Sequence, residues 1–190
     1  IQFTLSGKKI YTILGKNGSG KSTLIKSLTC LLNEELYIVN GNVLWFDENI
    51  FEMKYDRLIK LRRNEIKYVL QDLTNNIDPL KKLKYYFDKS GIEEKIISNS
   101  LKDFLLPDYQ TISTLHSYEI SGGMAQRLSL MLAILSNPKL LILDEPTSAI
   151  DYANINLIKL KLKDFKKTGG SVLIVTQDID FAKEISDKIA

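Results

Sequence analysis

The sequence predicts an α/β fold with parallel strands, and three patterns support this prediction. A short apolar run at residues 9–14 leads directly into a glycine-rich loop, and leucine and isoleucine then recur at helical spacing over 21–32. Two later segments, 139–143 and 172–175, are continuous apolar runs, which is typical of parallel strands buried on both faces. Residues 154–167 between these runs have helical spacing, so strands and helices alternate along the chain.

The other predicted elements fill the intervals between these patterns. Residues 1–6 alternate between apolar and polar and should form a strand that Ser6 and Gly7 turn into the next one. The remaining expectations are a strand over 36–47 with a turn at Asn40 and Gly41, a helix over 54–64, a strand over 66–70, two or three helices over 80–106 broken near Ser90 and Gly91, and a helix over 124–135 that Asn137 and Pro138 end.

Length and composition are those of an ordinary globular chain. Its 190 residues are enough for one domain with a sizeable core and a small subdomain. The net charge of +3 is too small to indicate a nucleic-acid partner, so none is expected. Cys30 is the only cysteine, which excludes an internal disulfide, and its apolar surroundings predict a buried thiol.

The sequence contains neither a membrane-spanning nor an export signal. No apolar run approaches the roughly 20 residues that a helix needs to cross a bilayer. Residues 1–6 lack the basic start of a signal peptide. Because the chain opens inside a predicted strand, we expect further sequence upstream of it.

The glycine-rich loop fits the pattern G-x-x-x-x-G-K-[ST] and predicts a site for a nucleoside triphosphate. Its glycines let backbone N–H groups turn inward around phosphate oxygens, and the following helix directs its positive end to the same place. Lys21 should reach the β and γ phosphates, and the Ser22 hydroxyl should ligate Mg²⁺. The residues of the loop are Gly15, Lys16, Asn17, Gly18, Ser19, Gly20, Lys21 and Ser22.

The apolar run at 139–143 ends in two acids, Asp144 and Glu145. Charged side chains at the end of a buried strand are costly unless they meet a cation or water. We expect Asp144 to hold Mg²⁺, usually through water, and Glu145 to act as the general base that polarises the attacking water. Without the glycine loop, such an acidic strand end would indicate only a solvated turn.

A third motif, Ser121, Gly122 and Gly123, opens the predicted helix over 124–135. A serine and two glycines at a helix start leave free N–H groups that can bind an anion. Taken alone, these residues would be a plain helix N-cap. Because they precede the acidic strand end in the sequence, we also interpret them as an anion-binding site.

Together the three motifs resemble those of an ABC transporter ATPase. The matching runs are Lys-Asn-Gly-Ser-Gly-Lys-Ser, Ser-Gly-Gly-Met-Ala-Gln-Arg and Leu-Asp-Glu-Pro-Thr-Ser-Ala-Ile-Asp. The resemblance implies a P-loop NTPase of the ABC ATPase type, with a RecA-like core, an antiparallel β subdomain and a helical subdomain inserted at approximately residues 72–135. Residues 1–190 would be a single ATP-binding domain, truncated at both ends.

The resemblance also implies roles for individual residues. Ser121 to Gly123 would be the signature that contacts the γ phosphate of ATP held by the opposite subunit. Gln71 falls at the Q-loop position, and Asp151 at the D-loop that crosses the dimer interface. The implied sets are ATP contacts from residues 15–22, Thr23, Ser121, Gly122, Gly123 and Asp151, Mg²⁺ contacts from Ser22, Gln71 and Asp144, and catalytic roles for Glu145, Gln71 and Gln177.

Finer features are similar to importers of oligopeptides, dipeptides and nickel or metal chelates. Met124 stands where many family members have glutamine, and residues 106–108 and 76–79 also match that group. The resemblance implies a head-to-tail pair of ATPase subunits, membrane-spanning permease subunits and, indirectly, a solute-binding protein. The chain would then work at the cytoplasmic face of the cell membrane as a peripheral subunit.

One position departs from the family pattern. Thr176, Gln177 and Asp178 stand where the family has Thr-His-Asp, with the histidine as a switch at the γ phosphate. The Gln177 amide can donate a hydrogen bond but cannot carry a positive charge. Two outcomes stay open, a slow site or a tolerated substitution with intact activity.

Two other classes of function remain as alternatives. One is a non-transport ABC ATPase acting on ribosomes or DNA, and the other is a nucleotide-binding regulator that scarcely hydrolyses ATP. Of the remaining conspicuous residues, we expect His116 to be solvated or structural and Trp45 to pack rather than stack on a base.

Overall fold

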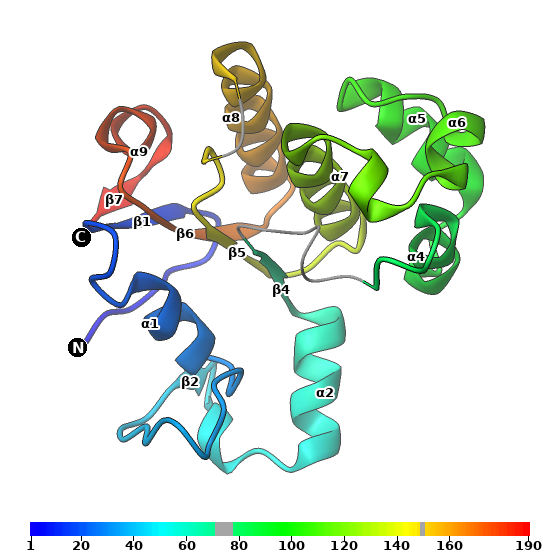
Figure 1. Ribbon diagram of the computed structural model, residues 1–190. Helices are drawn as coiled ribbons and strands as arrows, with labels where there is room; N and C mark the ends of the chain where they lie inside the picture. Colours follow the sequence, from blue (N-terminus) through cyan, green and yellow to red (C-terminus); the bar gives the residue numbers. More distant parts are fainter. Residues whose placement is uncertain (71–77, 149–150) are drawn as a thin grey trace.

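A computed structural model describes residues 1–70, 78–148 and 151–190 and shows an α/β fold, as predicted. Within these ranges, five parallel strands form one sheet in the order β4-β5-β6-β1-β7 (Figure 1). The strands are β1 Ile10–Leu14, β4 Ile66–Val69, β5 Leu140–Asp144, β6 Ser171–Thr176 and β7 Lys188–Ile189.

Helices cover the sheet and extend beyond its β4 edge. In Figure 1, α4, α5 and α6 lie together away from the sheet, and α7 lies between them and α8. The helices are α1 Lys21–Ser27, α2 Tyr55–Asn64, α4 Leu83–Ser90, α5 Glu94–Asp103, α6 Tyr109–Thr114, α7 Gly122–Leu135, α8 Tyr152–Lys167 and α9 Ile179–Ile185, with the 3₁₀ turns η1 Ile50–Glu52 and η2 Ser117–Glu119.

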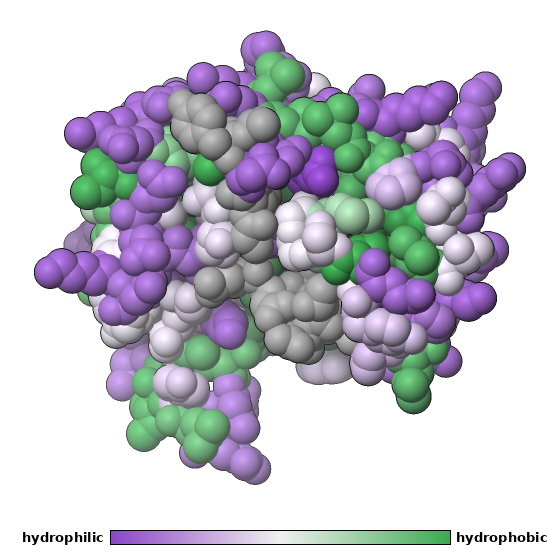
Figure 2. Space-filling model, turned by 45° about the horizontal axis from the view of Figure 1, so that its top comes forward, coloured by the Kyte–Doolittle hydropathy of each residue, from purple (hydrophilic) through white to green (hydrophobic). Residues whose placement is uncertain are grey.

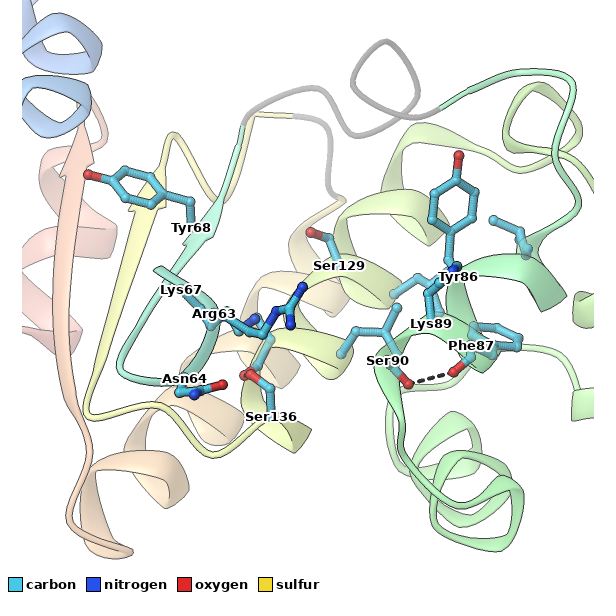
Figure 3. Close-up of a pocket in the computed structure, with 14 residues that line it drawn as sticks. Arg63, Asn64, Lys67, Tyr68, Tyr86, Phe87, Lys89, Ser90, Ser129 and Ser136 are labelled. Atoms are coloured by element: carbon cyan, nitrogen blue, oxygen red, sulfur yellow. Dashed lines mark hydrogen bonds between the residues drawn. The ribbon is translucent and has the colours of Figure 1, made fainter. Parts of the chain in front are cut away.

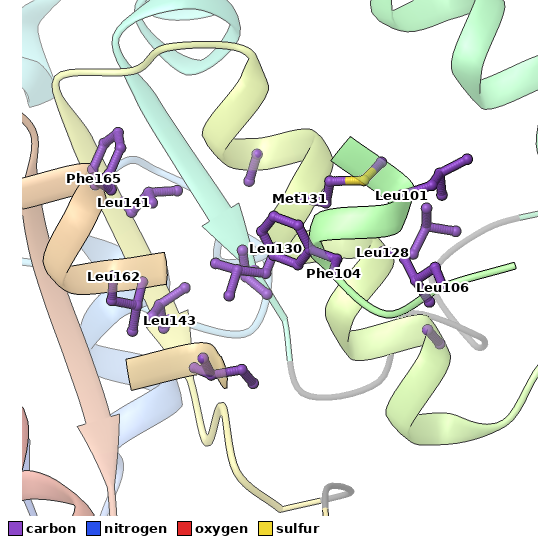
Figure 4. Packing of buried hydrophobic residues seen from close by; sticks show 14 of the residues in the cluster. Leu101, Phe104, Leu106, Leu128, Leu130, Met131, Leu141, Leu143, Leu162 and Phe165 are labelled. Carbon is purple, nitrogen blue, oxygen red and sulfur yellow. The ribbon is translucent and has the colours of Figure 1, made fainter. Parts of the chain in front are cut away.

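Side chains of the sheet alternate between two apolar cores, which explains the continuous apolar runs in the sequence. Leu141 and Leu143 of β5 join a core with α7, α8 and α9, whereas Ile142 joins a second core with α1 and α2. Figure 4 shows the first of these cores, where Leu162 of α8 lies beside β5. Apolar side chains of the sheet are therefore buried against helices on both faces.

Two predicted strands do not form. Residues 1–6 and 36–43 have no strand structure, and the antiparallel pairing in this region is a short hairpin of β2 Leu44–Trp45 and β3 Glu48–Asn49. Its turn lies at residues 46–47 instead of Asn40 and Gly41. Leu36 is 75% exposed and Ile38 is 91% exposed, so the alternating pattern there has no surface to pack against. The hairpin itself is fastened by Trp45, whose indole N–H donates to Glu65 at 2.9 Å.

The helix after the glycine loop ends earlier than predicted, at Ser27 instead of residue 32. Cys30 adopts a left-handed conformation with φ 55°, and its thiol is half-buried, not buried as expected. Arg62 of α2 donates to the backbone carbonyls of Thr29 and Cys30. This guanidinium satisfies two backbone carbonyl groups of the segment that follows α1.

The structure contains more helices and strands than the sequence indicated. The break near Ser90 is confirmed at Gly91, which has φ 69°. Helix α6 was missed, although Asp108 caps it by accepting from the N–H of Thr111. Helix α9 and strand β7 were missed too, since each is too short to show a period. A helical subdomain over 72–135 stays a prediction about how the chain divides.

The surface mixes both kinds of side chain. On the face drawn in Figure 2, hydrophilic residues surround smaller hydrophobic areas. Of the helices that the structure describes, none combines the length and apolar character that a bilayer crossing requires.

We predict that Gly170→Ala destabilises the fold. A Cβ at this position would lie 2.3 Å from ring atoms of Phe165, which is buried in the core beneath α8. The ring must shift, and such overpacking costs about 1–3 kcal/mol of the free energy of unfolding. Urea denaturation measures this loss. Gly7→Ala is the control, because a Cβ there has no neighbour within 4 Å. Equal stability of the two variants would contradict the packing described here.

Candidate nucleotide-binding site

The site forms where the carboxyl ends of three neighbouring strands meet. Strands β5, β6 and β1 are adjacent in the sheet. Leu14 at the end of β1 pairs with Thr176 of β6, and Asp144 at the end of β5 pairs with Val175 of β6. The phosphate loop leaves β1 at this edge, and the N–H of Gly15 donates to the carbonyl of Thr176 at 3.2 Å. The predicted loop and the predicted acids are thereby placed at one edge of the sheet, as open α/β sheets place their ligands.

The phosphate loop turns tightly around its own lysine. Gly18 and Gly20 have φ 77° and 89°, a left-handed conformation that favours glycine. The ammonium group of Lys21 donates to the carbonyls of Gly15 and Lys16 at 2.7 and 3.0 Å. A Cβ at Gly15 would lie 2.7 Å from the Ser19 hydroxyl oxygen, so a side chain there would displace that hydroxyl. Residues 16–20 are exposed, which leaves the outer side of the loop open to a ligand.

Ser22 and Asp144 bring two oxygen ligands together. The Ser22 hydroxyl donates to Oδ1 of Asp144 at 2.9 Å. Burial raises the pKa of the Asp144 carboxyl, and the charge of Glu145 raises it further, while the hydrogen bond from Ser22 opposes both. A bound cation would lower this pKa again, because it stabilises the ionised carboxylate. A hydroxyl and a carboxylate beside a phosphate loop are the oxygen ligands that Mg²⁺ takes in proteins, so these residues fit that ion.

Glu145 is buried and held at both carboxylate oxygens. Its Oε1 lies 3.2 Å from the Nζ of Lys21 but accepts no hydrogen bond within the described residues. Its Oε2 accepts from the Thr176 hydroxyl at 2.8 Å and from the backbone N–H of Gln177 at 3.2 Å. The backbone of Glu145 has φ 46°, a conformation uncommon outside glycine and often found at functional sites.

Thr176 is a residue of the site that the sequence analysis missed. It is fully buried at the end of β6, and its hydroxyl also accepts from the N–H of Asp178 at 3.1 Å. A threonine inside an apolar strand has high β propensity and gives no local signal of function. Gln177 enters the site through its backbone, while its side chain is exposed.

The signature and D-loop residues lie on other elements. Ser121 caps α7 by accepting from the N–H of Met124 at 3.2 Å, and Gly122 and Gly123 form the first turn. Asp151 caps α8 by accepting from the N–H of Asn154 at 2.9 Å. Ser121, Gly122 and Asp151 are exposed, and no hydrogen bond joins them to the phosphate loop among the residues that the structure describes. Gln71 lies outside the described residues.

Two residues set aside in the sequence analysis have structural roles. His116 closes a capping box in η2, where its ring Nδ1 lies 2.9 Å from Oε2 of Glu119. The sequence offered no partner for this histidine, and Glu119 is that partner. Trp45 packs against the second core and is half-buried.

Helix α1, which starts in the phosphate loop, is tied to the sheet behind it. The Tyr68 hydroxyl on β4 donates to the carbonyl of Ile25, and the Thr29 hydroxyl donates to Tyr68 at 3.1 Å. Burial raises the pKa of Tyr68, so the phenol stays protonated and keeps its donor. The orientation of α1, and therefore of Lys21 and Ser22, depends on these contacts.

A cleft of about 630 Å³ lies on the other side of β4, between the end of α2, α4 and α7. Figure 3 shows Arg63 and Lys67 at this cleft, with Tyr68 turned toward the opposite side of β4. Burial and the charge of Arg63 lower the pKa of Lys67. Lys89 of α4 also lines the cleft, but no residue of the phosphate loop does, so we assign the cleft no part in nucleotide binding.

Comparison with known proteins agrees with this geometry. Residues 1–148 match the family described as ABC transporter. A dipeptide transport ATP-binding protein, DppD, of Caldanaerobacter subterraneus subsp. tengcongensis is 34% identical over 200 residues, covering 100% of this chain and 61% of that protein. An oligopeptide transport ATP-binding protein, OppD, of Lactococcus lactis subsp. cremoris is 26% identical over 201 residues, covering 100% of this chain and 59% of that protein. The chain thus spans about three-fifths of the length of these relatives.

Solved structures agree as well. The dimeric structure of MJ0796, a bacterial ABC transporter cassette, superposes with a TM-score of 0.82 at 27% identity, covering 98% of this chain and 82% of that chain. A post-hydrolysis dimer of the same cassette bound to ADP and Pi gives a TM-score of 0.79 at 26% identity, with the same coverage. The structure therefore has the P-loop fold of an ABC ATPase, and the chain belongs to the ABC transporter family.

Proposed function

We propose that this chain is the ATP-binding part of an ABC transporter subunit, and that it binds and hydrolyses ATP with Mg²⁺ at the phosphate loop. The observation that carries the proposal is the meeting of Lys21 with Glu145, and of Ser22 with Asp144, at the ends of β1 and β5. A cation, a hydroxyl and two buried carboxylates beside a glycine loop supply the groups that phosphoryl transfer to water needs.

Each of these groups has a separate task. The ammonium group of Lys21 binds the phosphates. In this structure it contacts two loop carbonyls and the carboxylate of Glu145, and it would leave these partners when a phosphate binds. Glu145 accepts a proton from the attacking water as the bond to the leaving oxygen breaks. Ser22 and Asp144 would hold Mg²⁺, which neutralises phosphate charge when bound. Gln71 would contact the metal and the water, as the resemblance implies.

The exposed signature points to a second subunit. The N–H groups at the start of α7 and the exposed Ser121 are available to a ligand held by another chain. Asp151 at the start of α8 is also exposed. We propose that two ATPase subunits pair head to tail, so that each signature covers the nucleotide on the partner's phosphate loop.

The names of the relatives favour a peptide as the transported solute. The two curated relatives are a dipeptide and an oligopeptide transport protein, and further relatives from Brucella are named as putative peptide import proteins. We therefore propose a peptide importer that works with permease subunits and a solute-binding protein at the cytoplasmic face of the membrane. Nickel or metal chelates are the second substrate class, because the motif around Met124 is similar in those importers.

A slowly hydrolysing regulator is the second candidate function, and Gln177 favours it. A neutral amide at the switch position cannot supply the charge that a protonated histidine can. The buried, anchored Glu145 favours turnover instead, since a site without hydrolysis has no use for a base held at this position. A non-transport role at ribosomes or DNA has no observation in its favour here.

The first test of the proposal is Glu145→Gln. The amide cannot accept a proton, so ATP turnover should fall by about 10²–10³ while ATP still binds. Turnover is measured in the assembled complex, with the phosphate-loop lysine of any different second subunit replaced so that only this chain's loop works. Glu35→Gln is the matched control, because Glu35 is exposed and distant from Glu145 in the sequence. Unchanged turnover in Glu145→Gln would remove the base from the proposal.

The second test concerns the switch position. If Gln177 slows the site, Gln177→His should raise kcat several-fold in the same assay, because histidine can carry a charge and exchange a proton. Gln110→His on α6 is the control for an added surface histidine. A kcat that does not rise would show that glutamine is tolerated at this position, and the slow-site interpretation would be wrong.

A further inference from the structure

The two carboxylate oxygens of Glu145 have different surroundings. Oε2 receives two directed hydrogen bonds, from the Thr176 hydroxyl and from the N–H of Gln177. Among the residues that the structure describes, the partner of Oε1 is the ammonium group of Lys21, which directs its own hydrogen bonds to the carbonyls of Gly15 and Lys16. One oxygen is therefore fixed by the end of β6, and the other is buried and ready to accept a hydrogen bond.

The Thr176 hydroxyl has a defined orientation. Its oxygen accepts from the N–H of Asp178 at 3.1 Å, so its single proton is left for Glu145 at 2.8 Å. Asp178 is itself fixed, because its side chain accepts from the N–H of Phe181 at 2.9 Å as the cap of α9. The position of the carboxylate is thus set by the strand end and the first turn of α9.

The backbone of Glu145 depends on the same strand. Its N–H donates to the carbonyl of Val175 at 2.9 Å, and its φ of 46° turns the side chain back over the end of β6. A residue in this conformation is kept there by its surroundings. Thr176 supplies the one side-chain hydroxyl that donates to this carboxylate among the residues that the structure describes.

We propose that Thr176 is a positioning residue for hydrolysis, which rests on the proposed function of Glu145 as the base. Its hydroxyl anchors Oε2, so that Oε1 is the oxygen presented to water once Lys21 turns from the carboxylate to a phosphate. The proton taken from water then goes to Oε1, while Oε2 keeps its two donors. Thr176 touches neither ATP nor water in this arrangement, and it acts through Glu145 alone.

The variant Thr176→Val tests this proposal, because valine keeps the shape and removes the hydroxyl. A charge-assisted hydrogen bond is lost, and kcat should fall about tenfold while KM and ATP affinity change by less than about twofold. Thr176→Ser should restore most of the rate. Thr12→Val on β1 is the matched control, since Thr12 is equally buried and its hydroxyl lies 2.6 Å from that of Ser186.

A double-mutant cycle separates positioning from a merely structural effect. In single-turnover measurements on the assembled complex, Thr176→Val should have no further effect once Glu145→Gln is present, because the hydroxyl acts only through the base. A tenfold loss that persists in the Glu145→Gln background would overturn the proposal. So would an unchanged kcat in Thr176→Val, or an equal loss in Thr12→Val. Full turnover in Glu145→Gln alone would instead contradict the base assignment on which the proposal rests.

Discussion

The pairing of buried charges at the ends of β1 and β5 is the constraint on which the rest of the structure depends. Lys21, Asp144 and Glu145 are all buried, and a buried charge is costly unless it meets an opposite charge or a hydrogen-bond partner. Parallel order in the sheet brings the two strand ends to one edge, so each charge finds a partner.

The two apolar cores make this edge rigid. Strands β5 and β6 are buried along their whole length, so close packing opposes movement of their last residues. Tyr68 contacts one of the last carbonyls of helix α1, and Arg62 contacts a carbonyl of the segment that follows the helix. The phosphate loop is therefore held by its strand on one side and by the end of its own helix on the other. Precision at the loop arises from packing far from the nucleotide.

The sequence analysis located the strand, loop and helix of the candidate site more accurately than the hairpin beside them. The phosphate loop and the acids at the end of β5 are local patterns with strong composition signals, and the continuous apolar runs follow from burial on both faces. The hairpin was misplaced because Leu36 and Ile38 alternate like a strand but have nothing to pack on. Thr176 was missed because its role depends on a neighbour 31 residues away in the chain, which no local pattern reports.

The central claim is that the loop containing Lys21 is the nucleotide site, and the most direct test is ATP binding to the purified chain. Titration calorimetry with Mg²⁺ and ATP should show saturable binding of one nucleotide per chain. Lys21→Ala should weaken it at least about tenfold, because a charge-assisted contact to phosphate is lost. Lys60→Ala, an exposed lysine on α2, should bind as the parent does. Equal affinity of Lys21→Ala and the parent would contradict the account.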